Sequence, residues 1–126
     1  MDARVRVELR WRDMDMLGHL NQSVYHEFLE EGRAALFQPL MEREGWAFVL
    51  VRVELDHRHE VRRDHGHVDV VARVASVGRS SVTVENAMLL PDGTVAAEGR
   101  SVLVAWDPQR RAGRAITEAE RVVLEG

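Results

Sequence analysis

Near the start of the chain, apolar and polar residues alternate with a period of two. Along residues 4–12 the apolar face consists of Val5, Val7, Leu9 and Trp11. The opposite face carries only arginine and glutamate, so the pattern predicts a strand with one buried side. Residues 13–21 break this alternation, and we expect a loop there.

From about Ser23 the apolar residues recur at the spacing of an amphipathic helix. The apolar positions are Val24, Phe28, Leu29, Leu36 and Phe37. Asn21 or Ser23 can cap the first turn, and Pro39 is expected to end the helix or to begin its last irregular turn. Gly32 lies inside the helix, where glycine costs about 1 kcal/mol relative to alanine. A close approach between helix and sheet would explain this glycine.

The second half of the chain has the pattern of strands separated by short connections. The predicted strands cover residues 47–55, 68–77, 80–90 and 95–106. A strong turn signal, Pro91-Asp92-Gly93-Thr94, separates the last two, and the last three strands form an antiparallel meander. Thr117 and Glu120 have the spacing of a capping box, which predicts a short helix near the end of the chain.

A strand, a long helix and then four strands indicate an α+β fold with one antiparallel sheet. The length of 126 residues and the lack of an internal repeat or linker predict a single domain over residues 1–126. The helix covers only one face of the sheet. The remaining face and the edges need cover, which favours a homo-oligomer.

Composition narrows the function mainly by exclusion. The absence of cysteine excludes disulfides, thiol chemistry and thiolate metal sites. All 17 basic residues are arginine, so no lysine can form a Schiff base. The net charge is −4, and no apolar run approaches the ~20 residues that span a bilayer. We expect a cytoplasmic protein that binds neither nucleic acid nor membranes.

The loop before the helix carries the main candidate chemistry. Asp15 stands seven residues before Gln22, near the predicted helix start. The free N–H groups of a helix N-terminus can polarise a carbonyl, and a nearby carboxylate can attack that carbonyl. We interpret Asp13 as a structural residue and Asp15 as the candidate catalytic carboxylate.

Other polar residues are weaker candidates. His19 either orders the loop by hydrogen bonding or contacts substrate and carries a proton near neutral pH. Asn21 is a cap or loop organiser that shapes the site. Tyr25 lies in the first helical turn, where core packing is favoured over catalysis. Arg79 and Ser80 offer donors suited to phosphate, although surface charge is the default interpretation of Arg79.

Four histidines form two His-x-His pairs, namely His57, His59, His65 and His67. On a strand, each pair would point to one side and could hold a metal. The pairs lack an obvious carboxylate partner and a helical His-x-x-x-His spacing. Exposed strand and loop histidines are therefore the favoured interpretation, and we expect no metal.

A family resemblance rests mainly on two motifs, DMDMLGHLNQSVY at residues 13–25 and FLEEGR at residues 28–33. It extends more weakly to GRSSV at residues 78–82 and to the segment 92–100. The chain resembles the hotdog-fold acyl-CoA thioesterases, in particular the 4-hydroxybenzoyl-CoA thioesterase-like family. The resemblance implies a long helix wrapped by an antiparallel sheet. It also implies dimers that pair their sheets edge to edge, with sites at subunit interfaces.

The resemblance further implies a reaction, the hydrolysis of acyl-CoA to a carboxylic acid and CoA, with no cofactor. Asp15 matches the catalytic carboxylate, as nucleophile or general base, and the N–H that polarises the thioester falls near Gln22. His19, Asn21 and Tyr25 then become candidate substrate contacts. Arg79, with Ser80, matches the basic surface that meets CoA phosphates in a homodimer or homotetramer.

Two departures from the family pattern leave the acyl group open. Gln22 replaces the second Asn of the Gly-His-x-Asn-Asn pattern, and Gly66-His67 replaces a common Gly-Asp. Two alternatives also stay open. One is a thioesterase that acts on acyl-carrier-protein thioesters, and the other is a noncatalytic acyl-CoA-binding hotdog protein, against which Asp15 argues.

Overall fold

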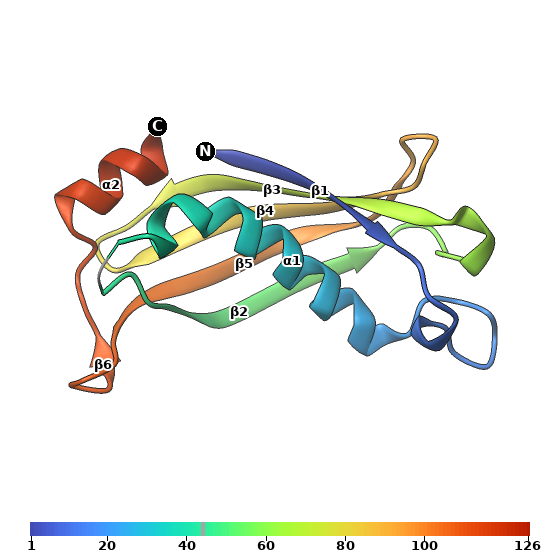
Figure 1. Cartoon of the computed structure of the whole chain (residues 1–126), viewed down its shortest axis with the longest axis horizontal. Coiled ribbons are helices and arrows are strands. Elements are labelled where there is room, and N and C mark those ends of the chain that lie inside the picture. Colours follow the sequence, from blue (N-terminus) through green and yellow to red (C-terminus); the bar gives the residue numbers. More distant parts are fainter. Residues whose placement is uncertain (44) are drawn as a thin grey trace.

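In the computed structural model, which describes residues 1–43 and 45–126, one antiparallel sheet wraps around a long helix, α1 (Gln22–Met41) (Figure 1). The long strands are β1 (Asp2–Glu8), β2 (Phe48–His57), β3 (His67–Val77), β4 (Ser81–Leu89) and β5 (Val95–Asp107). The shorter elements are β6 (Ala112–Gly113), the 3-10 turns η1 (Trp11–Asp13) and η2 (Arg63–His65), and helix α2 (Glu118–Glu125). This arrangement confirms the predicted α+β hotdog fold.

The order of the strands across the sheet is β1-β3-β4-β5-β2, and every neighbouring pair is antiparallel. The meander of β3, β4 and β5 is therefore confirmed. The sequence did not predict the partners of the two earlier strands. β1 lies at one edge beside β3, β2 lies at the other edge beside β5, and β6 pairs with the end of β5.

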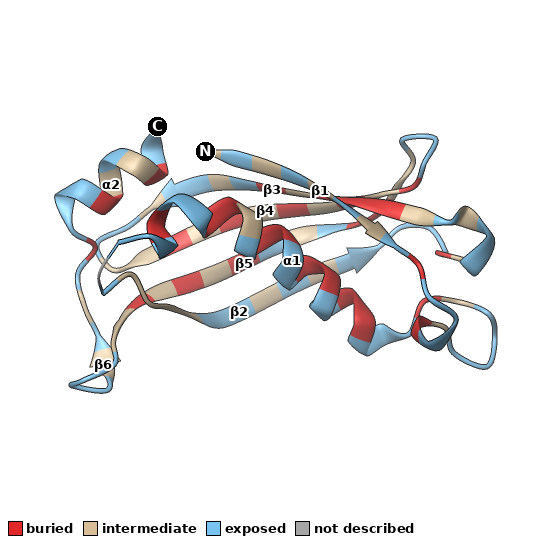
Figure 2. Ribbon diagram, in the orientation of Figure 1, coloured by how far each residue is buried: buried red, intermediate tan, exposed pale blue. Residues whose placement is uncertain are grey.

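The core lies between α1 and the inner face of the sheet (Figure 2). Along β4 the burial alternates residue by residue, as expected for a strand covered on one face. The helix buries a stripe along its whole length, formed by Val24, Tyr25, Phe28, Leu29, Gly32, Arg33, Leu36, Phe37 and Leu40. The predicted apolar stripe thus faces the sheet.

Two glycines allow close backbone approaches. A Cβ on Gly32 would lie 2.7 Å from Cγ1 of Val70 on β3, which confirms the predicted close approach of helix and sheet. A Cβ on Gly99 would lie 1.8 Å from the backbone oxygen of Glu54. The edge strand β2 can therefore pair with β5 at this point only because residue 99 has no side chain.

A polar chain crosses the middle of the core. The guanidinium of Arg33 donates to the hydroxyl of Ser101 (3.1 Å), which donates to the side-chain oxygen of Asn86 (2.8 Å). Burial lowers the pKa of Arg33, although the charge of Glu30 opposes this shift. These residues divide the core into two apolar clusters, one beneath each half of α1.

The first strand ends earlier than expected. β1 stops at Glu8, and Trp11 lies in η1 with 80% of its surface exposed rather than on the buried face of a strand. Local hydrogen bonds explain why the strand ends early. The backbone N–H of Arg10 donates to the Asp13 carboxylate (2.8 Å), and the N–H of Asp13 donates to the carbonyl of Arg10 (3.0 Å). These bonds close a turn where the alternation predicted strand.

The ends of the helices follow the sequence closely. Asn21 caps α1, and its side chain accepts from the N–H of Ser23 (3.4 Å). Pro39 lies in the last turn of α1, which continues to Met41. The capping box of Thr117 and Glu120 starts α2 as predicted.

No helix in the described part of the chain is long and apolar enough to cross a membrane.

Candidate active site

Asp15 organises the loop that precedes α1. Its Oδ1 accepts hydrogen bonds from the N–H groups of Leu17 (2.9 Å) and His19 (3.1 Å), and its own N–H donates to the carbonyl of His19 (2.8 Å). Gly18 closes the turn at φ 76°, a left-handed conformation that favours glycine. The second carboxylate oxygen, Oδ2, has no hydrogen-bond partner among residues 1–43 and 45–126.

Asp13 differs sharply from Asp15 although only one residue separates them. Its side chain is buried and receives donors from the guanidinium and the N–H of Arg10. Burial alone would raise the pKa of Asp13, but these hydrogen bonds and the charge of Arg10 outweigh it and hold the pKa below its ordinary value. The carbonyl of Asp13 also accepts from the N–H of Asn21 (2.8 Å), so Asp13 holds both ends of the loop.

The start of α1 leaves a backbone donor free beside this loop. Asn21 caps the helix, and its carbonyl accepts from the N–H of Val24 (2.9 Å). Gln22 is the first helical residue, and its N–H has no partner in the part of the chain that the structure describes. Free N–H groups give a helix N-terminus a partial positive charge, which favours a developing negative charge on a bound oxygen.

One hollow of about 400 Å³ brings most of the predicted site together. Asp15, His19, Gln22 and Tyr25 all line it, and Asn21 is the cap beside them. The phenol of Tyr25 is buried and packs edge-on against His57, with 4.6 Å between ring centroids. Burial, and then the charge of Asp15, raise the pKa of Tyr25, so its hydroxyl stays a hydrogen-bond donor.

The other wall of the hollow comes from the segment after β2, which sequence reasoning missed as part of this site. His57 is the last residue of β2, and Arg58, His59 and Glu60 follow it in this wall. Val61 is fully buried, and its carbonyl accepts from the N–H of Leu20 (2.8 Å), which docks this segment on the loop before α1. The His-x-His pattern drew attention to this region for a different reason, whereas Glu60 had no signal in the sequence.

Glu60 links the two walls. One oxygen lies 2.7 Å from Nε2 of His19, and the other accepts from Nη1 of Arg62 (2.7 Å). Arg62 also donates from Nε to Asp64 (2.9 Å). The hydrogen bond from Arg62, with help from His19, holds the pKa of Glu60 below its ordinary value despite partial desolvation.

Arg79 and Ser80 lie far from these residues within one chain. They form the turn between β3 and β4, at the end of the sheet that carries α2, whereas the Asp15 loop lies at the opposite end (Figure 1). The carbonyl of Arg79 accepts from Ile116 and that of Ser80 from Ala105, both at 2.8 Å. A single chain therefore does not join this turn to Asp15.

Of the paired histidines, one from each pair lies near the other. His59 and His65 pack edge to face, with 6.4 Å between ring centroids. Within residues 1–43 and 45–126, no group of three or more histidine, aspartate or glutamate side chains could hold a metal ion.

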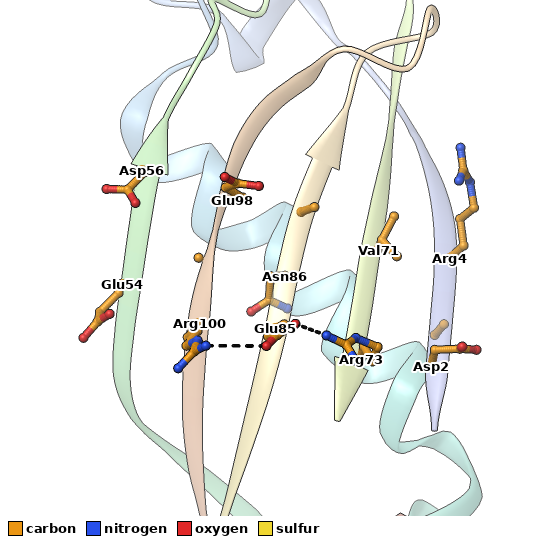
Figure 3. Close-up of a pocket in the computed structure, with 13 residues that line it drawn as sticks. Asp2, Arg4, Glu54, Asp56, Val71, Arg73, Glu85, Asn86, Glu98 and Arg100 are labelled. Carbon is orange, nitrogen blue, oxygen red and sulfur yellow. Dashed lines mark hydrogen bonds and ion pairs between the residues drawn. The ribbon is translucent and has the colours of Figure 1, made fainter. Parts of the chain in front are cut away.

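A larger hollow of about 730 Å³ lies on the outer face of the sheet and contains none of the predicted residues (Figure 3). Its floor is a row of alternating charges across all five long strands, in the order Asp2, Arg73, Glu85, Arg100 and Glu54. Glu85 pairs with Arg73 and lies 3.6 Å from Arg100. Only Glu85 is held between two guanidiniums in this row, and among the described residues no helix start lines this hollow, whereas Gln22 at the start of α1 lines the Asp15 hollow.

Comparison with known proteins identifies the family. The model of the thioesterase-like superfamily matches residues 9–125. The chain belongs to this superfamily. Its members include hotdog-fold thioesterases, in agreement with the resemblance, and the chain is a thioester hydrolase. The comparison with curated proteins gives no significant match.

Solved structures support the same conclusion. A Thermus thermophilus thioesterase complexed with coenzyme A and zinc is 32% identical, with a TM-score of 0.87 over 97% of this chain and 90% of that one. A protein from Bacillus stearothermophilus described as a predicted thioesterase is 26% identical, with a TM-score of 0.88 over 99% and 95%. A DHNA-CoA thioesterase from Staphylococcus aureus shares the fold at 16% identity, with a TM-score of 0.80 over 90% and 80%.

Proposed function

We propose that this thioester hydrolase acts on acyl-CoA and releases a carboxylic acid and CoA. One observation carries the proposal. The free Oδ2 of Asp15 and the free N–H of Gln22 belong to residues that line the same hollow. Acyl transfer requires two groups: a nucleophile or base on one side of the carbonyl, and an N–H donor for the carbonyl oxygen.

In the proposed reaction, the thioester oxygen accepts a hydrogen bond from the N–H of Gln22. Asp15 then attacks the carbonyl carbon to form a mixed anhydride, or it acts as a general base for water. Asn21 keeps the first turn of α1 in place, and Tyr25 and His19 contact the substrate around the reacting carbonyl. The reaction needs no cofactor, since the CoA thioester is itself the substrate.

The proposal includes a second subunit. Arg79 and Ser80 offer phosphate donors, but they lie at the opposite end of the sheet within one chain. In a homodimer or homotetramer with sites at its interfaces, this turn would come from a neighbouring subunit and bind the CoA phosphates. The coenzyme A in the Thermus thioesterase supports CoA as the carrier.

The test is Asp15→Asn, assayed with short, long and aromatic acyl-CoAs. Asparagine keeps an oxygen for the N–H groups of Leu17 and His19, so the loop should keep its shape. We expect kcat/KM to fall about 10³-fold, which corresponds to about 4 kcal/mol of transition-state stabilisation. Asp56→Asn is the matched control, because Asp56 is exposed on β2 and its nearest ion pair is long at 3.4 Å.

Near-normal hydrolysis by Asp15→Asn across the whole panel would refute the assignment of the site.

The carrier needs its own comparison, in which the same acyl group is presented on CoA and on acyl carrier protein. A kcat/KM at least 100-fold higher with the carrier protein would replace CoA as the proposed substrate. Charge reversal at Arg79, as Arg79→Glu, should raise KM for acyl-CoA with little change in kcat.

A further inference from the structure

The contact between His19 and Glu60 joins two segments that are distant in the sequence. Nε2 of the imidazole and Oε2 of the carboxylate are 2.7 Å apart, on the wall of the hollow that also holds Asp15. About two fifths of each side chain is exposed, so water can reach the ring. An exposed contact between two side chains contributes little to stability, whereas its place in the site points to a chemical role.

Glu60 is held in one orientation from its other side. Arg62 donates to Oε1 at 2.7 Å, so Oε2 is the oxygen that remains for His19. The main chain at this point is also fixed, because the carbonyl of Glu60 lies 2.8 Å from Nδ1 of His59. An ionised carboxylate can only accept hydrogen bonds. His19 must therefore carry a proton on Nε2.

The proton on Nε2 determines what the rest of the ring can do. In a neutral imidazole with Nε2 protonated, Nδ1 is a free acceptor and can take a proton from water. The backbone N–H of the same residue binds Oδ1 of Asp15 (3.1 Å), so ring and carboxylate originate from one turn. The other charged or titratable groups that line the hollow are Tyr25 on α1, His57 at the end of β2, and Arg58 and His59 after it; Arg62 lies behind Glu60.

We propose that Glu60 is a positioning residue that presents Nδ1 of His19 as the base for the hydrolytic water. This proposal rests on the proposed function and assigns the nucleophilic role to Asp15. Oδ2 of Asp15 forms a bond to the acyl carbon as the C–S bond breaks and CoA leaves as a thiolate. Water then adds to that carbon, its proton passes to Nδ1, and the bond between the acyl carbon and Oδ2 breaks to restore the carboxylate. The proton on the imidazole finally returns to solvent.

Glu60→Gln is a sharp test because Arg62 controls how the new amide sits. The amide oxygen should face Arg62, which leaves the NH₂ group facing Nε2 of His19. The ring must then accept at Nε2 and carry its proton on Nδ1, so the base is lost while the shape is kept. We expect steady-state kcat to fall about 100-fold, as for the loss of a general base.

The step affected distinguishes this role from a structural one. In rapid-mixing experiments, Glu60→Gln should still release about one CoA per site in a fast burst, because His19 takes up no proton during the attack by Asp15. His19→Ala should keep the burst amplitude at saturating substrate, although the loss of its substrate contact slows the burst, and added imidazole should restore its turnover but not that of Glu60→Gln. Asp64→Asn is the control, since Asp64 binds Arg62 without reaching His19.

The outcomes separate the two proposals. An active Asp15→Asn variant overturns the proposed site. If Asp15→Asn is inactive but Glu60→Gln turns over at the wild-type rate, the proposed site stands and only the role of Glu60 is overturned. Equal loss of burst and turnover in a folded Glu60→Gln also overturns it, because the pair would then act before CoA leaves.

Discussion

The two ends of α1 both meet clusters of charged residues, but only the cluster at the carboxyl end is closed. There, Arg114 donates to both oxygens of Glu120 (2.7 and 2.8 Å) and to the carbonyl of Gly45 (2.9 Å). Glu120 also accepts from Thr117 (2.9 Å), and both partners of the pair are largely buried. Every group in this cluster has a structural partner.

At the amino end the groups are of the same kind, yet the cluster is open. Asp15 is exposed and has one free oxygen, Gln22 has a free N–H, and the pair of His19 and Glu60 is open to water. A satisfied ion pair resists change and holds elements together, whereas an unsatisfied donor and acceptor can bind a substrate. The difference between the two ends lies in accessibility and free hydrogen-bonding groups rather than in residue type.

The largest effect on stability is expected at the closed end. Glu120→Gln leaves Arg114 without its counterion in a largely buried position, which should lower the free energy of unfolding by about 3 kcal/mol. Hydrolysis per folded molecule should stay close to wild type. Denaturant unfolding with parallel activity assays checks both expectations, and loss of activity without loss of stability would break the distinction between the ends.

The pH dependence of unfolding provides a control for this prediction. Burial alone would raise the pKa of Glu120, but hydrogen bonds from Arg114 and Thr117 hold it below the ordinary value. A lowered folded pKa adds stability above the ordinary pKa of glutamate, ~4.3, and that stability is lost as the pH falls through the folded pKa. Between pH 6 and pH 3, wild type should lose more stability than Glu120→Gln.

A smaller effect is expected at the middle of α1, where the approach to the sheet sets the position of both ends. Gly32→Ala gains about 1 kcal/mol of helix propensity, but overpacking against Val70 costs about 1–3 kcal/mol. We expect a net loss of up to about 2 kcal/mol. In a Val70→Ala background the same substitution should stabilise, and a stabilising Gly32→Ala in the wild-type protein would contradict the close contact.

The smallest effect is expected from the helix caps, and it should differ between the ends. Asn21→Ala should cost about 0.5 kcal/mol, because its capping bond is long, whereas Thr117→Ala should cost about 1 kcal/mol. Only Asn21→Ala should also lower kcat, since it loosens the N–H of Gln22. Melting curves and steady-state kinetics on both variants test this contrast, and equal kinetic effects would argue against a role for the helix start.

Local patterns predicted most of the elements. The stripe of α1, the meander and the box of Thr117 and Glu120 depend on contacts within one element or between neighbours in the chain. Trp11 shows where such reasoning failed. Alternation alone placed it on a strand, but the side chain of Asp13 closes a turn with Arg10 before the strand can reach it.

For this protein, the sequence alone determined the amphipathic helix, its cap at Asn21 and the candidate carboxylate at Asp15, because periodicity and spacing express local geometry. Only the tertiary structure decided that Glu60 faces His19 and that Arg79 lies at the opposite end of the sheet. The pairing of β2 with β5 brings the segment after β2 to the start of α1. Contacts between segments so distant in the chain depend on how the whole sheet closes around the helix, and no short pattern encodes them.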